Sequence, residues 1–368
     1  MARTRAVSNN DSLGPTWTSG QEYRSVIATF TRPTVATERA MIAVVPGSNA
    51  PEVAVIVPTR NRPYGLQRLV RALEAQSISP DLWELVIVDD CSEEPTAMAI
   101  KKLIDASPLR TRSLRTGVSA GPAPVRNLGW RSTTSPLLAF IDDDCVPDPD
   151  WLAAGLLAIN GSPRIGVVQG RTVRPARSEA YPLTCYTVVR EVLKPSPWFE
   201  SCNIFFRRAA IEEAGGFDET IGRFGGWFAE DTLLGWSVIE AGWERAWADD
   251  AVVEHELSDR PFRWHIQKHY LEGHLVGVAA RFPQIRTMFW RPWAIKRDNA
   301  LFALAVVGLV LGIRWRPALL LTVPYLRALP SPWPKVGDPE GFAHQVACHA
   351  ASLAGKTVKG IQYRTVLL

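Results

Sequence analysis

The sequence predicts an α/β fold with a mostly parallel, Rossmann-like sheet and helices on both faces, followed by a helical, partly apolar C-terminal region. Short β-branched runs alternate with segments of helical periodicity between residues 53 and 159. Three of these runs end in polar clusters, at residues 59–60, 89–90 and 142–144. Two further apolar runs fall within residues 300–326.

The alternation begins at residues 53–57, a continuous run of apolar, mostly β-branched residues. Such a run is typical of a strand that is buried on both faces. Residues 66–73 then repeat apolar side chains at helical spacing, and residues 85–88 form a second apolar run of strand character. The same patterns predict a helix over residues 97–104 and a third strand over residues 111–114.

A Gly/Pro turn introduces the next expected helix, at residues 121–130, and residues 137–141 are expected to form the following strand. Residues 150–159 predict a helix whose first residue is an aspartate, a favoured N-cap residue. Further strands are predicted at residues 165–171 and 199–207. Together these elements predict βαβ units in one parallel sheet.

The second half of the pattern contains fewer strands. A glycine pair at residues 215–216 ends a short helix, and a longer helix opens near Glu230 and Asp231. Residues 252–256 follow a strand, and residues 261–282 have the pattern of one long helix with aromatic and basic residues.

Polar side chains follow three predicted strands at the points where those strands end. They are Thr59-Arg60, Asp89-Asp90 and the acidic cluster 142–144. In open α/β sheets, ligands bind outside the carboxyl ends of the strands. The sequence therefore predicts that these three clusters converge on one ligand site.

The acidic cluster itself needs a positive charge nearby. Asp142 and Asp144 have D-x-D spacing directly after a buried strand. Neighbouring carboxylates repel one another, and burying them without a partner is costly. A divalent metal held by oxygen ligands is the simplest partner. The alternative is a solvated acidic turn, because D-x-D on its own is a weak signal.

Composition excludes several classes of protein. The 368 residues are 46% hydrophobic and 21% charged, which argues against global disorder. A net charge of +4 and scattered basic residues argue against a nucleic-acid partner. Five cysteines without a C-x-x-C pair favour reduced thiols in a cytosolic setting over a disulfide frame or zinc site. Residues 1–20 lack the apolar core of a secretory signal.

Three parts are expected along the chain. Residues 1–50 are predicted to form a polar extension. It is expected either to be flexible or to add strands at the edge of the sheet, at residues 25–30 and 41–45. Residues 51–258 form the α/β domain. Residues 259–368 form the helical C-terminal region.

Eight short motifs carry a family resemblance over about residues 53–257. With these motifs in this order, the chain resembles the inverting glycosyltransferases of family 2, which have the nucleotide-sugar-binding GT-A fold. Each motif is weak alone, and it is the ordered set that is specific. The motifs are Val57-Pro58-Thr59-Arg60-Asn61-Arg62, Val88-Asp89-Asp90-Cys91-Ser92, Arg126-Asn127-Leu128-Gly129, Phe140-Ile141-Asp142-Asp143-Asp144, Arg207-Arg208, Gly215-Gly216-Phe217-Asp218-Glu219, Glu230-Asp231 and Val253-Glu254-His255.

The resemblance implies a site for a nucleotide-sugar donor. Within it, Asp90 would contact the base, and Asp142 would reach the ribose directly or through metal-bound water. Uridine is the usual base in the family, and thymidine and guanosine donors also fit. The implied donor-binding residues are Pro58, Thr59, Arg60, Asp90, Arg126, Asn127, Asp142 and Asp143.

The resemblance also implies Mn²⁺ or Mg²⁺ as a cofactor, with Asp144, His255 and Asp142 at the metal. The alternative for His255 is an ordinary surface or core histidine. Asp231 would be the catalytic base with Glu230 beside it, although two acids at a helix start also complement the helix dipole. Trp227 is either an acceptor platform or a packed side chain.

The implied activity is metal-dependent, inverting transfer of a sugar from a nucleotide-diphosphate sugar to a hydroxyl acceptor, such as a lipid-linked or cell-envelope glycan. One alternative is a sugar-phosphate nucleotidyltransferase. That class wants a Gly-rich basic loop after the first strand, where this chain has Pro58-Thr59-Arg60-Asn61. The other alternative is a catalytically idle, membrane-associated binding or scaffold protein of the same fold.

The apolar runs at residues 300–313 and 318–326 are each shorter than the roughly twenty residues of a simple membrane span. Arginine, lysine and tryptophan residues flank them. This pattern predicts peripheral contact with the cytoplasmic face of the plasma membrane. The alternative is a buried helical hairpin, packed on the catalytic domain or on a second subunit of a homo-oligomer.

Overall fold

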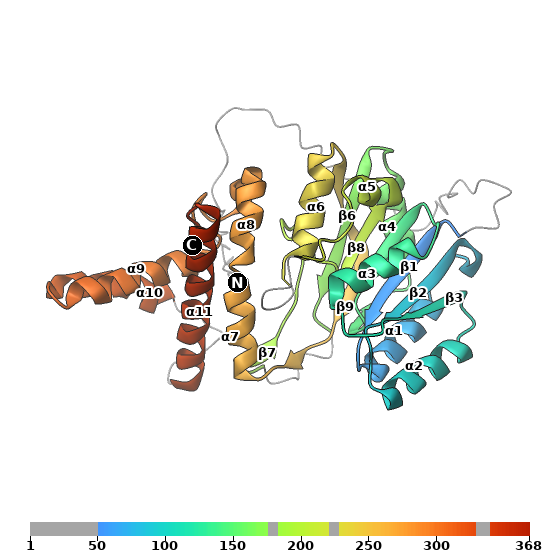
Figure 1. Ribbon diagram of the computed structural model, residues 1–368, viewed down its shortest axis with the longest axis horizontal. Coiled ribbons are helices and arrows are strands. Elements are labelled where there is room, and N and C mark those ends of the chain that lie inside the picture. The colour runs from blue at the N-terminus through green and yellow to red at the C-terminus, as the bar shows by residue number, and fades with distance from the viewer. Residues whose placement is uncertain (1–50, 176–182, 221–227, 329–338) are drawn as a thin grey trace, which may run out of the picture.

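The computed structural model describes residues 51–175, 183–220, 228–328 and 339–368. Its main feature is an eight-stranded sheet with the strand order β3-β2-β1-β4-β8-β6-β9-β5, and a short β10–β7 ribbon lies outside this sheet (Figure 1). The strands are β1 (Val53–Thr59), β2 (Trp83–Asp89), β3 (Thr111–Arg115), β4 (Leu137–Ile141), β5 (Cys145–Pro147), β6 (Ile165–Val173), β7 (Thr187–Val188), β8 (Asn203–Arg207), β9 (Glu244–His255) and β10 (Ser258–Asp259).

Helices connect and cover these strands. The α-helices are α1 (Pro63–Glu74), α2 (Glu94–Ala106), α3 (Pro122–Arg131), α4 (Trp151–Asn160), α5 (Arg208–Glu213), α6 (Glu230–Glu240), α7 (Phe262–Leu271), α8 (His274–Arg281), α9 (Arg297–Gly312), α10 (Val323–Ala328) and α11 (Pro339–Tyr363). The 3₁₀ helices are η1 (Pro80–Leu82), η3 (Pro283–Met288) and η4 (Arg316–Thr322).

The predicted α/β fold with a mostly parallel sheet is confirmed. Strands β3, β2, β1 and β4 run parallel to one another, and β6 runs parallel to β9. The antiparallel partners are β8, which lies between β4 and β6, and β5, which pairs with β9. The carboxyl ends of β1, β2 and β4 therefore meet at one edge, as the polar clusters after these strands required.

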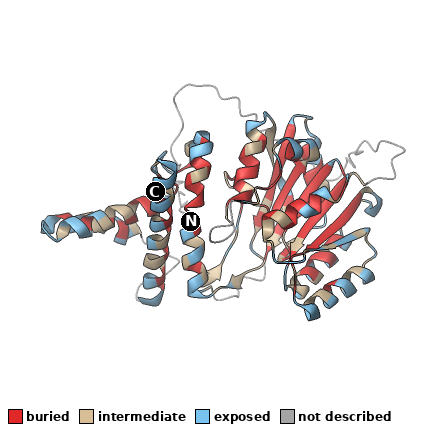
Figure 2. Cartoon of the chain, viewed as in Figure 1, coloured by how far each residue is buried: buried red, intermediate tan, exposed pale blue. Residues whose placement is uncertain are grey.

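The apolar run of β1 is buried on both faces because successive side chains point to opposite sides. Ala54 and Ile56 belong to a core that α3, α6 and α8 complete. Val53, Val55 and Val57 belong to a second core, completed by α1, α2 and α4. Figure 2 shows both layers as buried surfaces against the sheet. Because neither face of β1 is polar, each face of the sheet has to be covered by helices.

The structure corrects several predicted elements. The single helix expected over residues 261–282 is two helices, α7 and α8, which meet at Glu272 and Gly273. An added Cβ on Gly273 would lie 2.4 Å from the carbonyl oxygen of Gly355 on α11, so this break is where α11 packs closely. Strand β8 begins at Asn203 and not at residue 199.

Two smaller predictions concern the chain near helix α4 and the N-terminus. Asp150 occupies the N-cap position of α4, but its side chain makes no capping hydrogen bond. The candidate edge strands at residues 25–30 and 41–45 lie outside the described residues.

The C-terminal region extends away from the sheet. Helix α9, η4 and α10 form an arm that projects from the rest of the molecule, whereas α11 lies along α7 and α8 (Figure 1). Gly308 and Gly312 of α9 face Leu321 and Leu319, so the arm is a closely packed pair of segments. Within the described residues, no helix combines the length and apolar character needed to cross a membrane.

Candidate active site

Asp90, at the end of β2, organises the loop that follows β3. Its carboxylate accepts hydrogen bonds from the backbone N–H groups of Ala120 (2.6 Å) and Gly121 (3.1 Å). The hydroxyls of Ser119 (3.1 Å) and Thr116 (3.2 Å) donate to the same carboxylate. The side chain predicted to contact the base is thus fixed in place at the sheet edge. Its contact with a base stays a prediction.

The turn after β1 lies against the same loop. Arg60 donates a hydrogen bond to Ser119 at 2.5 Å. Pro58 and Thr59, the last residues of β1, pair in register with Val88 and Asp89 of β2. These predicted donor-binding residues therefore line one edge with the loop that Asp90 holds.

Asp143 faces back into the protein. Thr59 donates to one of its oxygens at 2.7 Å, and Arg62 donates to the other at 3.3 Å. Burial raises the pKa of Asp143 to about 7, against the opposing influence of Arg62. Arg62 also lies 2.5 Å from the carboxylate of Asp144. Arg62 is the last residue of the first motif but was not among the predicted site residues.

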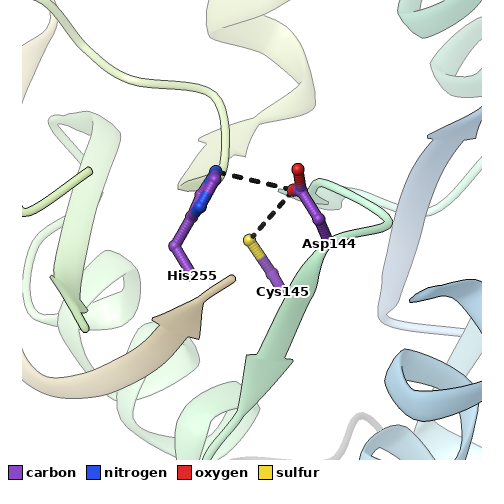
Figure 3. Close-up of side chains that lie close together, drawn as sticks. All are labelled: Asp144, Cys145 and His255. Atoms are coloured by element: carbon purple, nitrogen blue, oxygen red, sulfur yellow. Dashed lines mark hydrogen bonds and ion pairs between the residues drawn. The ribbon is translucent and has the colours of Figure 1, made fainter. Parts of the chain in front are cut away.

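Asp144, Cys145 and His255 come together where β5 pairs with β9 (Figure 3). His255 Nε2 lies 3.5 Å from Asp144 Oδ1, and His255 Nδ1 lies 3.0 Å from the backbone oxygen of Glu256. When Nδ1–H donates to that oxygen, the Nε2 lone pair faces a carboxylate oxygen. Two acceptors that face each other suit a divalent cation between them.

The third member of this group is a different kind of side chain. Burial raises the pKa of the Cys145 thiol well above its usual value, so it stays protonated and packs in the core. Asp142, the third predicted metal ligand, is held by Arg126 and is not part of the cluster in Figure 3. The residues that fit a metal are therefore Asp144 and His255.

Arg126 joins the acidic cluster to the start of α6. It lies 2.9 Å from Asp142 and 3.2 Å from Glu230, and its side chain is buried. Burial alone would raise the pKa of Asp142, but the Arg126 charge brings this pKa below its usual value. Arg126 thus forms ion pairs with two carboxylates that come from different parts of the chain.

Asn127, its neighbour on α3, points elsewhere. Its amide donates to the backbone oxygen of Phe217 (2.8 Å) and to Glu219 (2.7 Å). Its oxygen accepts from Trp130 (2.9 Å) and from the backbone N–H of Phe217 (3.0 Å). These hydrogen bonds connect α3 to the segment that follows Gly215 and Gly216. A contact between Asn127 and the donor stays a prediction.

Asp231 is the second residue of α6, which begins after Ala229 in a left-handed conformation. Its oxygens accept from the backbone N–H groups of Thr232 (2.8 Å) and Ser201 (3.3 Å). Burial, and then the charge of Glu230, raises the pKa of Asp231 to about 7. Glu230 is neutralised by Arg126, so the two adjacent acids have different environments. Asp231 is the one suited to gain and lose a proton near neutral pH.

A cavity of about 390 Å³ connects these groups with the C-terminal helices. Its lining includes Asp142, Arg126, Glu230 and Asp231 together with residues of α7 and α8. Trp227, the predicted acceptor platform, lies outside the described residues. The full lining is Pro122, Arg126, Asp142, Arg190, Trp198, Glu200, Ser201, Cys202, Phe228, Ala229, Glu230, Asp231, Thr232, Lys268, Glu272, Leu275, Ile295 and Lys296.

Comparison with known proteins gives relatives of one kind. A pre-mycofactocin glycosyltransferase of Mycobacterium tuberculosis is 29% identical over 249 residues, which is 64% of this chain and 49% of that protein. A validoxylamine A glucosyltransferase of Streptomyces hygroscopicus is 30% identical over 247 residues, which is 58% of this chain and 53% of that protein. The chain thus spans about half the length of these curated relatives.

Solved structures show the same fold. A mannosyltransferase from Pyrobaculum calidifontis, solved in complex with GDP-Man and Mn²⁺, aligns with a TM-score of 0.59 at 22% identity. The alignment covers 85% of this chain and 87% of the mannosyltransferase, and it confirms the predicted GT-A fold. The family model described as glycosyl transferase family 2 matches residues 54–215, which include the strands and acidic cluster described above. The predicted resemblance to the family 2 glycosyltransferases is therefore confirmed over residues 54–215.

Proposed function

We propose that this protein transfers a sugar from a nucleotide-diphosphate sugar to a hydroxyl group, with inversion and with a divalent metal. The observation that carries the proposal is the placement of Asp231. This carboxyl group lines the cavity, has a pKa raised to about 7, and lies beside the Arg126–Glu230 ion pair. Asp144 and His255 fit a metal but do not line that cavity.

The donor is proposed from the family and the site edge. A mannosyltransferase of the same fold was solved in complex with GDP-Man and Mn²⁺, which supports a nucleotide sugar and a divalent ion. We favour UDP as the nucleotide, with GDP and dTDP as the alternatives that the test below separates. Asp90 and the turn from Pro58 to Arg60 would hold the nucleotide, and Asp142 would face the ribose.

The chemistry follows from these side chains. Departure of a nucleoside diphosphate builds negative charge, which a bound Mn²⁺ or Mg²⁺ held by Asp144 and His255 would neutralise. Asp231 accepts the proton of the acceptor hydroxyl, which is a poor nucleophile until that proton leaves. Glu230 forms an ion pair with Arg126 beside Asp231, and after burial its charge is the largest cause of the raised pKa of Asp231.

The C-terminal arm supports a membrane-proximal acceptor. Its exposed apolar side chains include Ile313 (82% exposed), Leu320 (70%) and Val310 (60%), and Trp315 is also exposed. Arginine and lysine residues flank the arm. We propose that it lies in the interface of the plasma membrane on the cytoplasmic side, with a lipid-linked or cell-envelope glycan as acceptor. A homo-oligomer that buries the same surface is the alternative.

The first test is the thermal stability of the purified protein with UDP, GDP or dTDP, each with and without Mn²⁺. A ligand that binds only the native state raises the melting temperature by mass action. We expect one nucleotide to raise it, and to do so much more with Mn²⁺. A folded protein that responds to no nucleotide would contradict the proposal and favour an idle scaffold of this fold.

The second test separates binding from chemistry. Asp231→Asn should keep the nucleotide-induced shift and lose donor hydrolysis and transfer by about 10²- to 10⁴-fold. Asp105→Asn, an exposed carboxylate on α2, is the control and should leave both unchanged. Normal turnover in Asp231→Asn would remove Asp231 from the role of base.

A further inference from the structure

Two cations of the active-site cavity have no ion-pair partner in the described part of the chain. Arg190 and Lys268 both line the cavity, and among the described residues neither has a carboxylate oxygen within ion-pair distance. Asp142, Asp231 and Glu200 act on Arg190 only from a longer distance. The Lys268 ammonium lies 4.4 Å from the ring centroid of Phe228. Burial, and then the nearby charge of Arg190, lowers the pKa of Lys268. Two like charges are therefore held close together.

The other cations of the cavity are compensated. Arg126 is paired with two carboxylates, and Lys296 lies 3.9 Å from Glu272. Two further acids of the cavity are held by other donors: Glu200 accepts from Ser196 and Gln169, and Asp231 accepts from backbone N–H groups. The cavity thus holds two cations that form no ion pair with any carboxylate of its lining, and an anionic ligand would pair with them.

The location of Arg190 and Lys268 indicates that they contact the acceptor substrate and not the nucleotide-sugar donor. In an inverting, in-line displacement the nucleophile and the leaving group lie on opposite sides of the reacting carbon. Asp231 lines the same cavity as Arg190 and Lys268, and the predicted donor residues Asp142 and Arg126 also reach it, whereas Asp144 and His255 do not. Lys268 comes from α7, which contributes no residue to the predicted donor or metal site. The diphosphate leaving group belongs with the metal pair, so a second anion would have to enter with the acceptor.

We propose that Arg190 and Lys268 bind a phosphate group that the acceptor carries close to the hydroxyl activated by Asp231. This inference rests on the proposed transferase function and names the substrate class of the same cavity. A guanidinium and an ammonium together match the charge and the oxygen acceptors of a phosphate. Lipid phosphates and water-soluble phosphate esters both present this group. The aromatic and aliphatic side chains of the cavity wall are Trp198, Phe228, Leu275 and Ile295.

The test measures binding of inorganic phosphate to the metal-free, full-length protein by calorimetry. Arg190→Met and Lys268→Met remove the charges from two different segments and keep the apolar stems. Each should weaken phosphate binding about tenfold or more, because a charge-assisted hydrogen bond is lost. Lys101→Gln, an exposed lysine on α2, is the matched control and should bind phosphate as the wild type does.

Two further measurements separate the explanations. UDP binding in the presence of Mn²⁺ should be unchanged in both Met variants; its loss, with phosphate binding retained, would assign the cations to the donor and overturn the inference. Unchanged phosphate binding in both variants would overturn it as well. Farnesyl phosphate that binds far more tightly than inorganic phosphate identifies a lipid phosphate, and equal affinities identify a water-soluble ester. If wild type binds phosphate through these cations but binds no nucleotide, the proposed function fails and the anion site stands.

Discussion

Arg126 is the single residue on which the charge balance of the site depends. Its guanidinium is buried between Asp142 and Glu230, and these carboxylates come from β4's acidic turn and from α6. Replacing Arg126 with Met leaves two carboxylates without their counter-charge. We expect the free energy of unfolding to fall by about 3–5 kcal/mol. Urea denaturation measures the loss.

The control for that change lies on the same helix. Arg131 is half exposed and pairs with Glu219 at 3.5 Å. Arg131→Met should cost less than about 1 kcal/mol, because exposed ion pairs contribute little. Equal losses in the two variants would show that Arg126 has no special role in the charge balance.

The Asp231 carboxyl makes stability and activity depend on pH in opposite ways. Its pKa is raised to about 7 in the folded protein from an ordinary value of 3.8. Between these values the folded state keeps a proton that the unfolded chain releases, so this group destabilises the fold as pH rises from about 4 to 7. The melting temperature of Asp231→Asn minus that of the wild type should therefore increase as pH rises from 4.5 to 7.5. Wild-type transfer should increase over the upper part of the same range, because the base must be deprotonated.

Sequence patterns found the carboxylates of this site more readily than its cations. Asp90, Asp142 and Asp144 stand directly after apolar strands, where a parallel sheet exposes ligand-binding groups. Arg190 and Lys268 follow no such pattern, because their importance lies in facing the same cavity from segments far apart in sequence. Only tertiary structure brings them together.

At the scale of elements, α6 depends on a close approach to the segment before β8. A Cβ added to Gly235 would lie 2.1 Å from the ring of Phe199, so this helix can pack there only without a side chain. Gly235→Ala should lower the free energy of unfolding by about 1–3 kcal/mol through overpacking. It should also weaken catalysis, because α6 carries Asp231. Chemical denaturation and a transfer assay measure the two effects.

A glycine in open space is the control for that substitution. Nothing lies within 4 Å of a Cβ built on Gly117. Gly117→Ala should leave stability within about 0.5 kcal/mol of the wild type. If Gly235→Ala is equally harmless, α6 can shift to accommodate a methyl group, and the close approach does not fix its position.

Periodicity predicted most elements of the α/β domain, because its strands are apolar on both sides and its helices have one apolar stripe. The break between α7 and α8 was missed for a physical reason. Apolar residues continue at helical spacing on both sides of Gly273, and only the backbone of Gly355 on α11 reveals the break. A contact between residues this far apart leaves no periodic signal.

The whole molecule combines a catalytic sheet domain with an apolar arm whose surface is largely uncovered. Replacing Val310, Ile313 and Leu320 together with Gln should reduce binding to phosphatidylglycerol-containing vesicles by 10-fold or more. Burying one such side chain contributes roughly 1.5–3 kcal/mol, and this contribution would be lost three times. Sedimentation with vesicles measures the effect, and the melting temperature should stay near that of the wild type.

Met98→Gln is the control for the vesicle experiment, because Met98 is 69% exposed on α2 of the sheet domain. It should leave vesicle binding unchanged. If the triple variant also binds vesicles normally but changes its sedimentation coefficient, the arm is an oligomer contact. The sequence alone could not separate these outcomes, because apolar runs of this length are compatible with a membrane surface, a second subunit or a buried hairpin.

Arg62 gives the metal pair a property that no motif suggests: the site carries its own internal counter-ion. A guanidinium nitrogen of Arg62 lies 2.5 Å from Asp144 and 3.3 Å from Asp143, so the proposed metal would have to displace an existing cation. That exchange is unfavourable unless the released guanidinium finds a new anion, and a nucleotide diphosphate arriving at the same edge provides one. Metal and donor should therefore bind cooperatively, each increasing the affinity for the other. Without donor, the site should release the metal and form the Arg62–Asp144 ion pair again.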